Sequence, residues 1–309
     1  MKNFLPLAYF QNQFISIEKA QVSIATHALH YGTAALGGLR GVLNPQNPSE
    51  ILLFRLDRHC QRLSNSAKYL NYDLPADKIE HIITDFVLKN RPQTSFYLRP
   101  LVYTSSLGIA PRLHQIEQDF LVYGLAIADD LYPEGISCRF SSWYRQEDRS
   151  CPLKGKTSAS YITSALAKTE AVESGFDEAI LLNSQGKVAE ASAANIFIVR
   201  NETLITPSCN QDILEGITRD SIMSIAQDLG IKTEARAVDK SELLIADEVF
   251  VCGTALKITS VNRIENYRLP DNKTITNQLK KQFTAATENK APQYQDWITI
   301  IKLSTNQQM

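Results

Sequence analysis

Cysteine is scarce in this sequence, and its distribution excludes two common uses of the residue. The chain of 309 residues has five cysteines and no Cys-x-x-Cys pair. An odd, scattered set matches neither the ligand spacing of a zinc ribbon nor the pairing of a disulfide framework. We therefore expect reduced thiols in a cytoplasmic protein, and no metal site. The cysteines are Cys60, Cys138, Cys151, Cys209 and Cys252.

Excess charge and long apolar runs are also missing. Lys and Arg number 32 against 33 Asp and Glu, a net charge of -1, which gives no reason to expect nucleic acid or an anionic membrane as partner. The run LVYGLAIA at 121–128 is far shorter than the roughly 20 residues of a membrane helix. The first residues, MKNFLPLAYFQNQF, lack the pattern of a signal peptide. The sequence predicts a protein that binds small molecules.

What is present is an alternation of strand and helix patterns over a length that favours two domains. Strands are expected at 13–17, 51–56, 94–103 and 119–128, and helices at 58–70 and 76–90. The polar, turn-forming ADDLYPEG at 128–135 is the best boundary candidate. We expect an α/β fold with an N-terminal domain at 1–130, a linker at 131–136 and a larger C-terminal domain at 137–309.

Further patterns follow the boundary. They predict a strand at 136–145, a helix at 161–175, a hairpin at 178–191, a strand at 195–200 and a helix at 216–230. In the helix at 161–175 the spacing predicts a buried stripe of Ile162, Ala165, Leu166 and Val172.

Two lysines stand among small residues in CPLKGKTSASYITSALAKTEAVESG, residues 151–175. Side chains two apart on an extended segment share a face, so periodicity does not choose between Lys154 and Lys156. One interpretation is a pair of solvated lysines, which this segment alone favours. The other is a Schiff-base lysine, partly desolvated so that its neutral amine is accessible near pH 7.

Two glycine-containing segments are candidates for anion binding. In EGITRDSI at 215–222, Gly216 permits a close approach of the backbone and Thr218 is a suitable N-cap. A helix start of this kind binds phosphate, although an ordinary capped helix has the same pattern. In VCGTALKIT at 251–259, Gly253, Thr254 and Ala255 predict either a second anion-binding turn or a plain turn.

Glu190 lies in KVAEASAANIFIV, between two apolar strand patterns. A buried carboxylate is costly unless it is paired with a cation or is protonated. The pyridine nitrogen of pyridoxal phosphate is one such partner, since a carboxylate keeps it protonated. A lysine or arginine of the chain is the alternative.

Arginines and histidines complete the set of candidates. Arg40, Arg62 and Arg99 lie beside apolar elements and suit either phosphate and carboxylate binding or structural ion pairs. His27 and His30 have helical spacing, but no acidic or cysteine partner lies at usable spacing, so we expect a structural role.

Together these segments resemble the class IV pyridoxal-phosphate aminotransferases, most closely the branched-chain amino acid aminotransferases. The resemblance runs from about Phe14 to Val261. The segments that carry it, in the family's order and spacing, are HALHYGTAALGGLRG, RHCQRLSNSAKYL, SFYLRPLVY, GKTSASYITSALAKTEA, GFDEAILLNSQGKVAEASAANIF, EGITRDSI and IADEVFVCGTA.

The resemblance implies a two-domain α/β enzyme of fold type IV with a barrel-like C-terminal domain. It implies a homodimer that binds pyridoxal 5'-phosphate and exchanges amino groups between branched-chain L-amino acids and 2-oxoglutarate. Lys156 takes the place of the Schiff-base lysine, because it precedes Tyr161 by the family's interval. Glu190 takes the place of the partner of the pyridine nitrogen.

The resemblance also implies the remaining contacts. Tyr161 falls beside the ring oxygen of the cofactor and Leu214 on its ring face. The implied phosphate contacts are Arg62, Ile217, Thr218 and Thr254. The implied substrate contacts are Tyr31, Leu36, Arg99, Thr254 and Ala255.

Three segments depart from the family's pattern without removing a catalytic group. Leu36-Gly37-Gly38 stands where many relatives have an acidic or aromatic residue, and we expect it to widen the substrate pocket. ASAAN at 191–195 replaces a glycine- and glutamate-bearing segment, and Thr-Ser-Ala follows Lys156 in place of glycines. Alternatives on the same fold are a D-amino acid or (R)-amine transaminase and an aminodeoxychorismate lyase. An alternative of another class is a cofactor-binding protein without turnover.

Overall fold

Two α/β units make up the chain, and the structure, a computed structural model, describes residues 3–303. The first unit, hereafter unit 1, comprises Met1–Asp129, Gly155–Ala159 and Ala285–Met309. Unit 2 comprises Asp130–Lys154 and Ser160–Thr284. The division near residue 130 lies close to the expected boundary. The segments 155–159 and 285–309, which we expected in the C-terminal domain, group with unit 1 instead. Hydrogen bonds tie Lys156 and residues 298–303 to strands of this unit.

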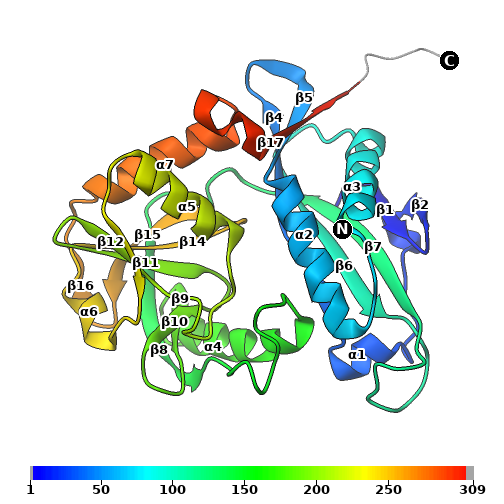
Figure 1. Cartoon of the computed structure of the whole chain (residues 1–309), viewed down its shortest axis with the longest axis horizontal. Coiled ribbons are helices and arrows are strands. Elements are labelled where there is room, and N and C mark those ends of the chain that lie inside the picture. The colour runs from blue at the N-terminus through cyan, green and yellow to red at the C-terminus, as the bar shows by residue number, and fades with distance from the viewer. Residues whose placement is uncertain (1–2, 304–309) are drawn as a thin grey trace. The chain divides into compact units, whose positions relative to one another are not determined.

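An antiparallel sheet of eight strands forms unit 1 (Figure 1). Its order is β17-β5-β4-β6-β7-β1-β2, with β3 paired to β6. The long central pair β6–β7 is in register from Phe96↔Ala126 to Thr104↔Gln118. The strands are β1 (Leu7–Phe10), β2 (Gln13–Ser16), β3 (Ala34–Leu36), β4 (Leu39–Asn44), β5 (Asn47–Phe54), β6 (Phe96–Thr104), β7 (Gln118–Ala126) and β17 (Ile298–Lys302).

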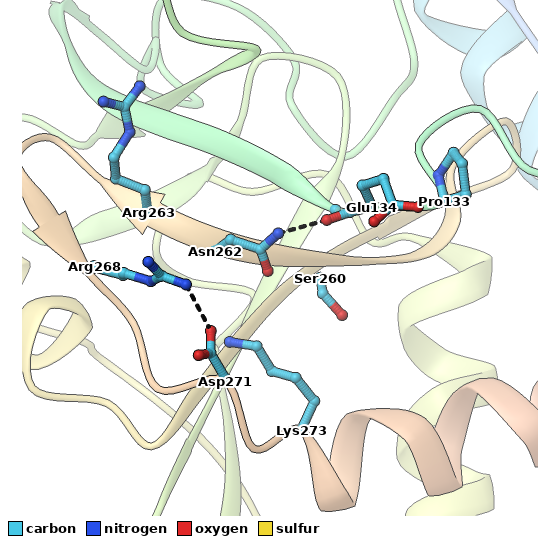
Figure 2. Close-up of a pocket in the computed structure, with 9 residues that line it drawn as sticks. Pro133, Glu134, Ser260, Asn262, Arg263, Arg268, Asp271 and Lys273 are labelled. Atoms are coloured by element: carbon cyan, nitrogen blue, oxygen red, sulfur yellow. Dashed lines mark hydrogen bonds and ion pairs between the residues drawn. The ribbon is translucent and has the colours of Figure 1, made fainter.

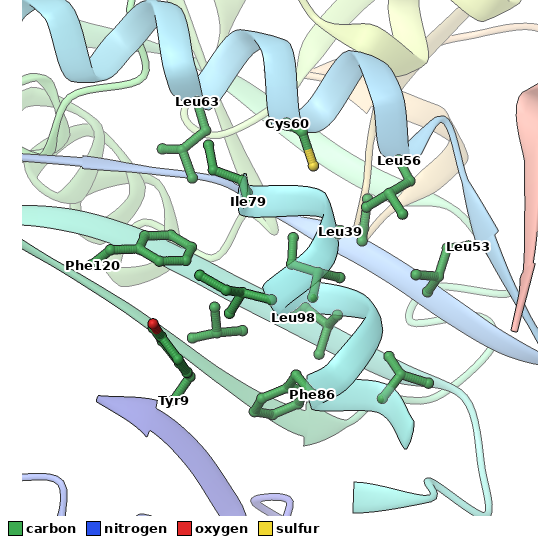
Figure 3. Close-up of a cluster of buried hydrophobic side chains, with 14 of the residues drawn as sticks. Tyr9, Leu39, Leu53, Leu56, Cys60, Leu63, Ile79, Phe86, Leu98 and Phe120 are labelled. Carbon is green, nitrogen blue, oxygen red and sulfur yellow. The ribbon is translucent and has the colours of Figure 1, made fainter. Parts of the chain in front are cut away.

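Two helices, α2 (Leu56–Ala67) and α3 (Ala76–Asn90), bury their apolar stripes against this sheet (Figure 3). Leu56, Cys60 and Leu63 recur at intervals of three and four, which places them on one face of α2. On α3, the buried residues with this spacing are Ile79, Ile82, Ile83 and Phe86. The shorter helices of this unit are η1 (Ile17–Lys19), α1 (His27–Tyr31), η2 (Lys68–Leu70) and η4 (Pro292–Trp297).

Unit 2 is built on a mixed sheet of nine strands in the order β10-β9-β8-β15-β14-β11-β12-β13, with β16 paired to β15. The edge strand β10 connects to β11, five positions away, through a tight turn closed by the bond from Ala191 N–H to Ala194 O. The sheet therefore curls into a half-barrel. The strands are β8 (Ile136–Tyr144), β9 (Glu178–Leu182), β10 (Val188–Ala191), β11 (Asn195–Arg200), β12 (Thr203–Pro207), β13 (Thr233–Arg236), β14 (Glu248–Gly253), β15 (Lys257–Ile264) and β16 (Tyr267–Arg268).

Helices accompany the second sheet, and its interior is filled by branched apolar side chains such as Ile180, Ile198 and Val251. The expected strands and helices of this half are present, so the predicted α/β fold is confirmed. The helices are α4 (Tyr161–Glu173), α5 (Ile217–Asp228), α6 (Lys240–Leu244) and α7 (Thr274–Thr287), and the short η3 (Ser158–Ser160) directly precedes α4. Among residues 3–303, no helix is long and apolar enough to cross a membrane.

The predicted buried stripe of α4 is wrong. Ile162 is 62% exposed and Val172 is 54% exposed, and Ala165 and Leu166 are also exposed. The helix instead buries small side chains against β8 and β9, namely Thr163, Ser164, Ala167 and Ala171. Small side chains let the helix axis approach the sheet closely, so the large residues that dominate the periodicity face outward.

Candidate functional site

Lys156 lies on a segment that is hydrogen-bonded to the strands and helices of unit 1. Its backbone N–H donates to Ser66 Oγ on α2 (3.1 Å), and its carbonyl accepts from the N–H of Leu36 on β3 (2.8 Å). The next residue, Thr157, forms a bridge with Ala35. The main chain at Lys156 is therefore fixed on both sides, while its side chain is half-buried.

Arg62 and Lys156 lie near a buried histidine that we did not predict as a site residue. Burial, and then the positive charges of Arg62, Lys156 and Arg55, hold the pKa of His59 well below its usual range. The Nδ1 atom of His59 is buried without a hydrogen-bond partner. Ser66 Oγ also donates to Arg62 O (2.8 Å), so one serine joins the Arg62 turn to the Lys156 main chain. Unit 1 thus gathers cations that suit an anionic ligand.

The spacing of residues in the sequence could have indicated His59 as a site residue. It stands three residues before Arg62, and Ser66 stands four residues after, so all three share one side of α2. A histidine in such a position is more often structural, and spacing alone does not separate the two roles.

Lys154, the other lysine of the segment, is already engaged in unit 2. Its amine pairs with Glu215 (3.2 Å) and donates to the carbonyl of Cys209. Its side chain is 41% exposed. The surface interpretation therefore describes Lys154.

Glu190 lies on β10 and is buried in a network of donors. Arg145 forms an ion pair with its Oε1 (3.0 Å), and the two side chains are only 7% and 8% exposed. Its Oε2 accepts from Asn195 Nδ2 (3.0 Å) and from the N–H of Leu214 (3.2 Å). The arginine partner that the sequence left as an alternative is therefore present. Neither Arg145 nor Asn195 was predicted.

Asn195 connects Glu190 to the start of α5. Its amide also donates to Leu214 O (3.0 Å), and its Oδ1 would lie 1.9 Å from a Cβ placed on Gly216. Gly216 must therefore lack a side chain. It is also the N-cap of α5, with no capping side chain, so the predicted N-cap role of Thr218 is wrong. The glycine takes this position because the close approach to Asn195 leaves no room for a hydroxyl-bearing residue.

Ile217 and Thr218 form the first turn of α5 and are buried. The first N–H groups of a helix have no acceptor within the helix, and they lie at its positive end. The turn with Thr254 and Ala255 follows β14, whose Cys252 pairs with Asn195 across the ladder. Unit 2 therefore brings Glu190, Leu214, the start of α5 and this turn into one neighbourhood. Tyr161 is half-buried at the first position of α4.

The predicted substrate residues Tyr31, Leu36 and Arg99 all belong to unit 1. Leu36 is buried on β3, and Tyr31 is half-buried with its ring 4.6 Å from that of His27. Arg99 donates to Tyr97 Oη (3.2 Å), and its buried Nε has no hydrogen-bond partner.

The glycines after Leu36 make room for neighbours of unit 1. A Cβ on Gly38 would lie 2.0 Å from Tyr97 Oη, and one on Gly37 would lie 2.7 Å from Pro100 Cγ. The hydroxyl of Tyr97 fills the space beside Gly38, and the expectation that this segment widens the substrate pocket stays a prediction.

The histidines of α1 are structural, as expected. His27 Nε2 lies 2.7 Å from the carbonyl of Ala110 and its Nδ1 lies 2.9 Å from Thr104 Oγ1, while His30 contacts Ile24 O. Within 3–303, no three His, Cys, Asp or Glu side chains form a group that could hold a metal ion.

The chain is similar to known proteins over nearly its whole length. The family described as amino-transferase class IV matches residues 47–264. A probable branched-chain-amino-acid aminotransferase of Synechocystis sp. is 65% identical over 304 residues, which cover 98% of this chain and 100% of that protein.

Solved structures show the same fold. The branched-chain aminotransferase from Thermoproteus uzoniensis with norvaline is 32% identical at a TM-score of 0.91, covering 96% of this chain and 99% of that one. A T.th. branched-chain amino acid aminotransferase, complexed with N-(5'-phosphopyridoxyl)-L-glutamate, is 34% identical at a TM-score of 0.89, covering 96% and 98%. The fold is thus that of the two-unit α/β enzymes called fold type IV. The chain belongs to the class IV aminotransferases.

Proposed function

We propose that this protein is a pyridoxal-phosphate-dependent transaminase that exchanges amino groups between branched-chain L-amino acids and 2-oxoglutarate. The observation that carries the proposal is the anchoring of Lys156, whose main chain is bonded to both α2 and β3 while its side chain stays half-buried. The proposed substrates of the protein come from its relatives, which are named branched-chain aminotransferases. Solved structures of such enzymes hold norvaline or a phosphopyridoxyl-glutamate.

The residues present fit pyridoxal phosphate. The orphaned Nδ1 of His59, beside the charges of Arg62 and Lys156, suits an anionic group. Arg62 would hold the phosphate together with Ile217, Thr218 and Thr254. Glu190 would face the pyridine nitrogen, with Leu214 on the ring face and Tyr161 beside the ring oxygen. When bound, the cofactor supplies a conjugated ring that withdraws electrons from the α-carbon of the substrate.

Lys156 has two tasks in this proposal. Its amine would hold the cofactor covalently through the cofactor's aldehyde group until substrate binds. The freed amine would then move the proton of the substrate's α-carbon. The bonds of Lys156 to Ser66 and Leu36 keep the start of its side chain fixed during both tasks.

Glu190 would keep a proton on the pyridine nitrogen. Its orientation follows from Arg145, Asn195 and the N–H of Leu214, which hold both carboxylate oxygens. Because these donors favour the ionised carboxylate, a protonated nitrogen facing it is stabilised.

The substrate residues would have to accept either an aliphatic side chain or a second carboxylate. Leu36 would contact the aliphatic side chain, and Tyr31, Thr254 and Ala255 would bind substrate carboxylate groups. The guanidinium of Arg99, with its unpartnered Nε, suits the carboxylate of glutamate. The D-amino acid, (R)-amine and aminodeoxychorismate alternatives are not favoured, since the relatives are named branched-chain enzymes.

We further propose a homodimer in the cytoplasm, with no nucleic-acid or membrane partner. Ile24, Leu29, Leu107 and Ile109 are between 64% and 95% exposed. A bridge between Thr26 and Leu107 joins the two segments that carry them, so they form an apolar patch that suits a partner subunit. All five cysteines are free, which supports a reducing compartment. Sedimentation showing monomer alone at working concentration would argue against the dimer.

The near-visible absorbance of the bound cofactor tests the proposed reaction. We expect L-leucine to discharge the band of the native protein and 2-oxoglutarate to restore it, whereas D-alanine leaves it unchanged. Lys156→Ala should lack the band of the lysine-bound cofactor. Lys154→Ala, two residues away, is the matched control and should retain it. A band that persists in Lys156→Ala but disappears in Lys154→Ala would contradict the assignment, and a band unmoved by L-leucine would contradict the substrate class.

A further inference from the structure

A pocket in unit 2 has a volume of about 480 Å³ and is lined by side chains of both charges (Figure 2). This volume is within the range of small-molecule sites. Ser260 and Asn262 line it from β15, Arg268 from β16, and Asp271 and Lys273 from the loop before α7. Thr254 and Ala255 are not among the lining residues, and Ser260, the nearest lining residue on β15, lies three residues after Lys257, roughly 10 Å along the strand. The pocket is therefore distinct from the turn that holds Thr254 and Ala255.

Lys273 is a buried cation, and its surroundings are the main reason to expect a bound ligand. Its side chain is only 9% exposed, yet it forms no ion pair with the described residues, and its amine donates to the carbonyl of Val261 (3.1 Å). Burial lowers its pKa, against the attraction of Glu248 and Asp271. Glu248 is committed elsewhere, since its two oxygens accept from Ile275 and Thr276 at the start of α7. A buried ammonium without a paired carboxylate is a costly arrangement that a bound anion would relieve.

The other charged groups are exposed. Arg268 pairs with Asp271 at 3.3 Å, with side chains 80% and 86% exposed, and such a pair contributes little and exchanges partners readily. The carboxylate of Glu134, on the facing loop, has no partner within 3–303. Arg263 points away from the other side chains in Figure 2, and its guanidinium lies 4.7 Å from the ring of Phe176.

The wall formed by Glu134 and Gly135 is held against β15. Asn262 Nδ2 donates to Glu134 O at 2.5 Å. Gly135 has φ +80°, and a Cβ there would lie 2.6 Å from the Asn262 amide. The loop therefore packs closely on the strand and keeps Glu134 beside the pocket.

We propose that this pocket binds a free α-amino acid as its zwitterion. Lys273 and Arg268 would take the carboxylate, and Asp271 and Glu134 the ammonium. The pocket thus has two cations and two carboxylates. A simple anion would pair with the cations and leave the two carboxylates uncompensated. A simple cation would pair with the carboxylates and leave the two cations uncompensated. A ligand that carries both charges satisfies both pairs.

Calorimetric titration of the full chain with L-proline tests the proposal, because its secondary amine is not a transamination substrate. Pyrrolidine and cyclopentanecarboxylate have the same ring with one charge each. We expect L-proline to bind at least about tenfold more tightly than either. Lys273→Met should weaken L-proline binding by at least about tenfold. Lys232→Met is the matched control and should not, because Lys232 is 71% exposed in the same unit.

Asp271→Asn provides a second variant, because its side chain is exposed and its loss will not disturb the fold. The Asp271→Asn variant should bind L-proline more weakly than the native protein does. It should bind cyclopentanecarboxylate as tightly as the native protein or more tightly. The proposal is overturned if cyclopentanecarboxylate binds as tightly as L-proline, if Lys273→Met binds L-proline like the native protein, or if no heat is detected up to about 10 mM ligand.

Discussion

Arg145 and Glu190 form an ion pair whose two side chains are more than nine-tenths buried. Removing one partner of such a pair leaves the other as an uncompensated buried charge. We therefore expect Arg145→Met to lower the free energy of unfolding by about 3–5 kcal/mol and to weaken binding of pyridoxal phosphate, because Glu190 is then held by Asn195 and Leu214 alone. Urea denaturation and a cofactor titration measure the two effects.

Arg149→Met is the control for this change. Arg149 also pairs with a glutamate, Glu147, but its side chain is 86% exposed, and little stability should be lost. Equal losses in the two variants would show that burial of the Arg145 pair is not what makes it important.

His59 predicts a pH dependence of stability. Its pKa in the fold lies well below 6.5, first because of burial and then because of the charges of Arg62, Lys156 and Arg55. Below pH 6.5 the unfolded chain binds a proton at this residue that the folded chain does not, so the free energy of unfolding falls as the pH falls from 6.5 toward the folded pKa. The slope from this residue is up to about 1.4 kcal/mol per pH unit.

Urea denaturation of His59→Gln at pH 7, 6 and 5 tests this expectation. The variant should show a shallower decline than the native protein. His81→Gln, whose side chain is 77% exposed, should decline like the native protein. If the His59 and His81 variants followed the same curve, the buried neutral state of His59 would be refuted.

At the scale of elements, α4 tests which face of a helix is buried. Ala167 is fully buried against β8 and β9, whereas Ile162 is 62% exposed. We expect Ala167→Leu to lower the free energy of unfolding by about 1–3 kcal/mol through overpacking. Ile162→Ala should change it by no more than about 0.5 kcal/mol. The opposite order in thermal or urea unfolding would favour the face that spacing alone predicted.

The elements also show where spacing is informative. In α2 and α3, large apolar residues such as Leu63 and Phe86 occupy the buried face, so the pattern of apolar residues and the pattern of burial coincide. In α4 they differ, because Ser164 and Ala167 permit close packing and carry little hydrophobic signal. Binary periodicity identifies a face by its large residues and fails where a small-residue face is buried.

The same limit applies to the candidate site. Glu190 could be singled out because a carboxylate between apolar strands needs a partner, but its partner Arg145 lies 45 residues earlier, and no local pattern connects them. Periodicity did not separate Lys154 from Lys156; a tertiary contact with Glu215 does. The N-cap of α5 was assigned to Thr218 by residue type, whereas the clash with Asn195 that requires Gly216 is visible only in the fold.

At the scale of the whole molecule, substitutions in β17 test whether the two units unfold independently. Ile301 is 4% exposed in the core of unit 1, and its neighbour Ile300 is 43% exposed. We expect Ile301→Ala to lower the free energy of unfolding by about 2–5 kcal/mol and Ile300→Ala to leave it almost unchanged. Hydrogen exchange should show faster exchange in β5 and α3 of the Ile301 variant and unchanged exchange in β11 and β14. Uniform loss of protection would mean that the units unfold as one.

The pairing of β17 with β5 also has a consequence for synthesis on the ribosome. Domains generally fold as units while the chain emerges, starting from the N-terminal end. Here the edge strand β5 meets its partner only after Ile298–Lys302 have been translated, more than 240 residues later. Segment 155–159 likewise reaches unit 1 after a stretch of unit 2 has been made. Unit 1 therefore begins to fold first and completes its folding last. A nascent chain that stalls late in translation exposes the edge of β5 to other chains.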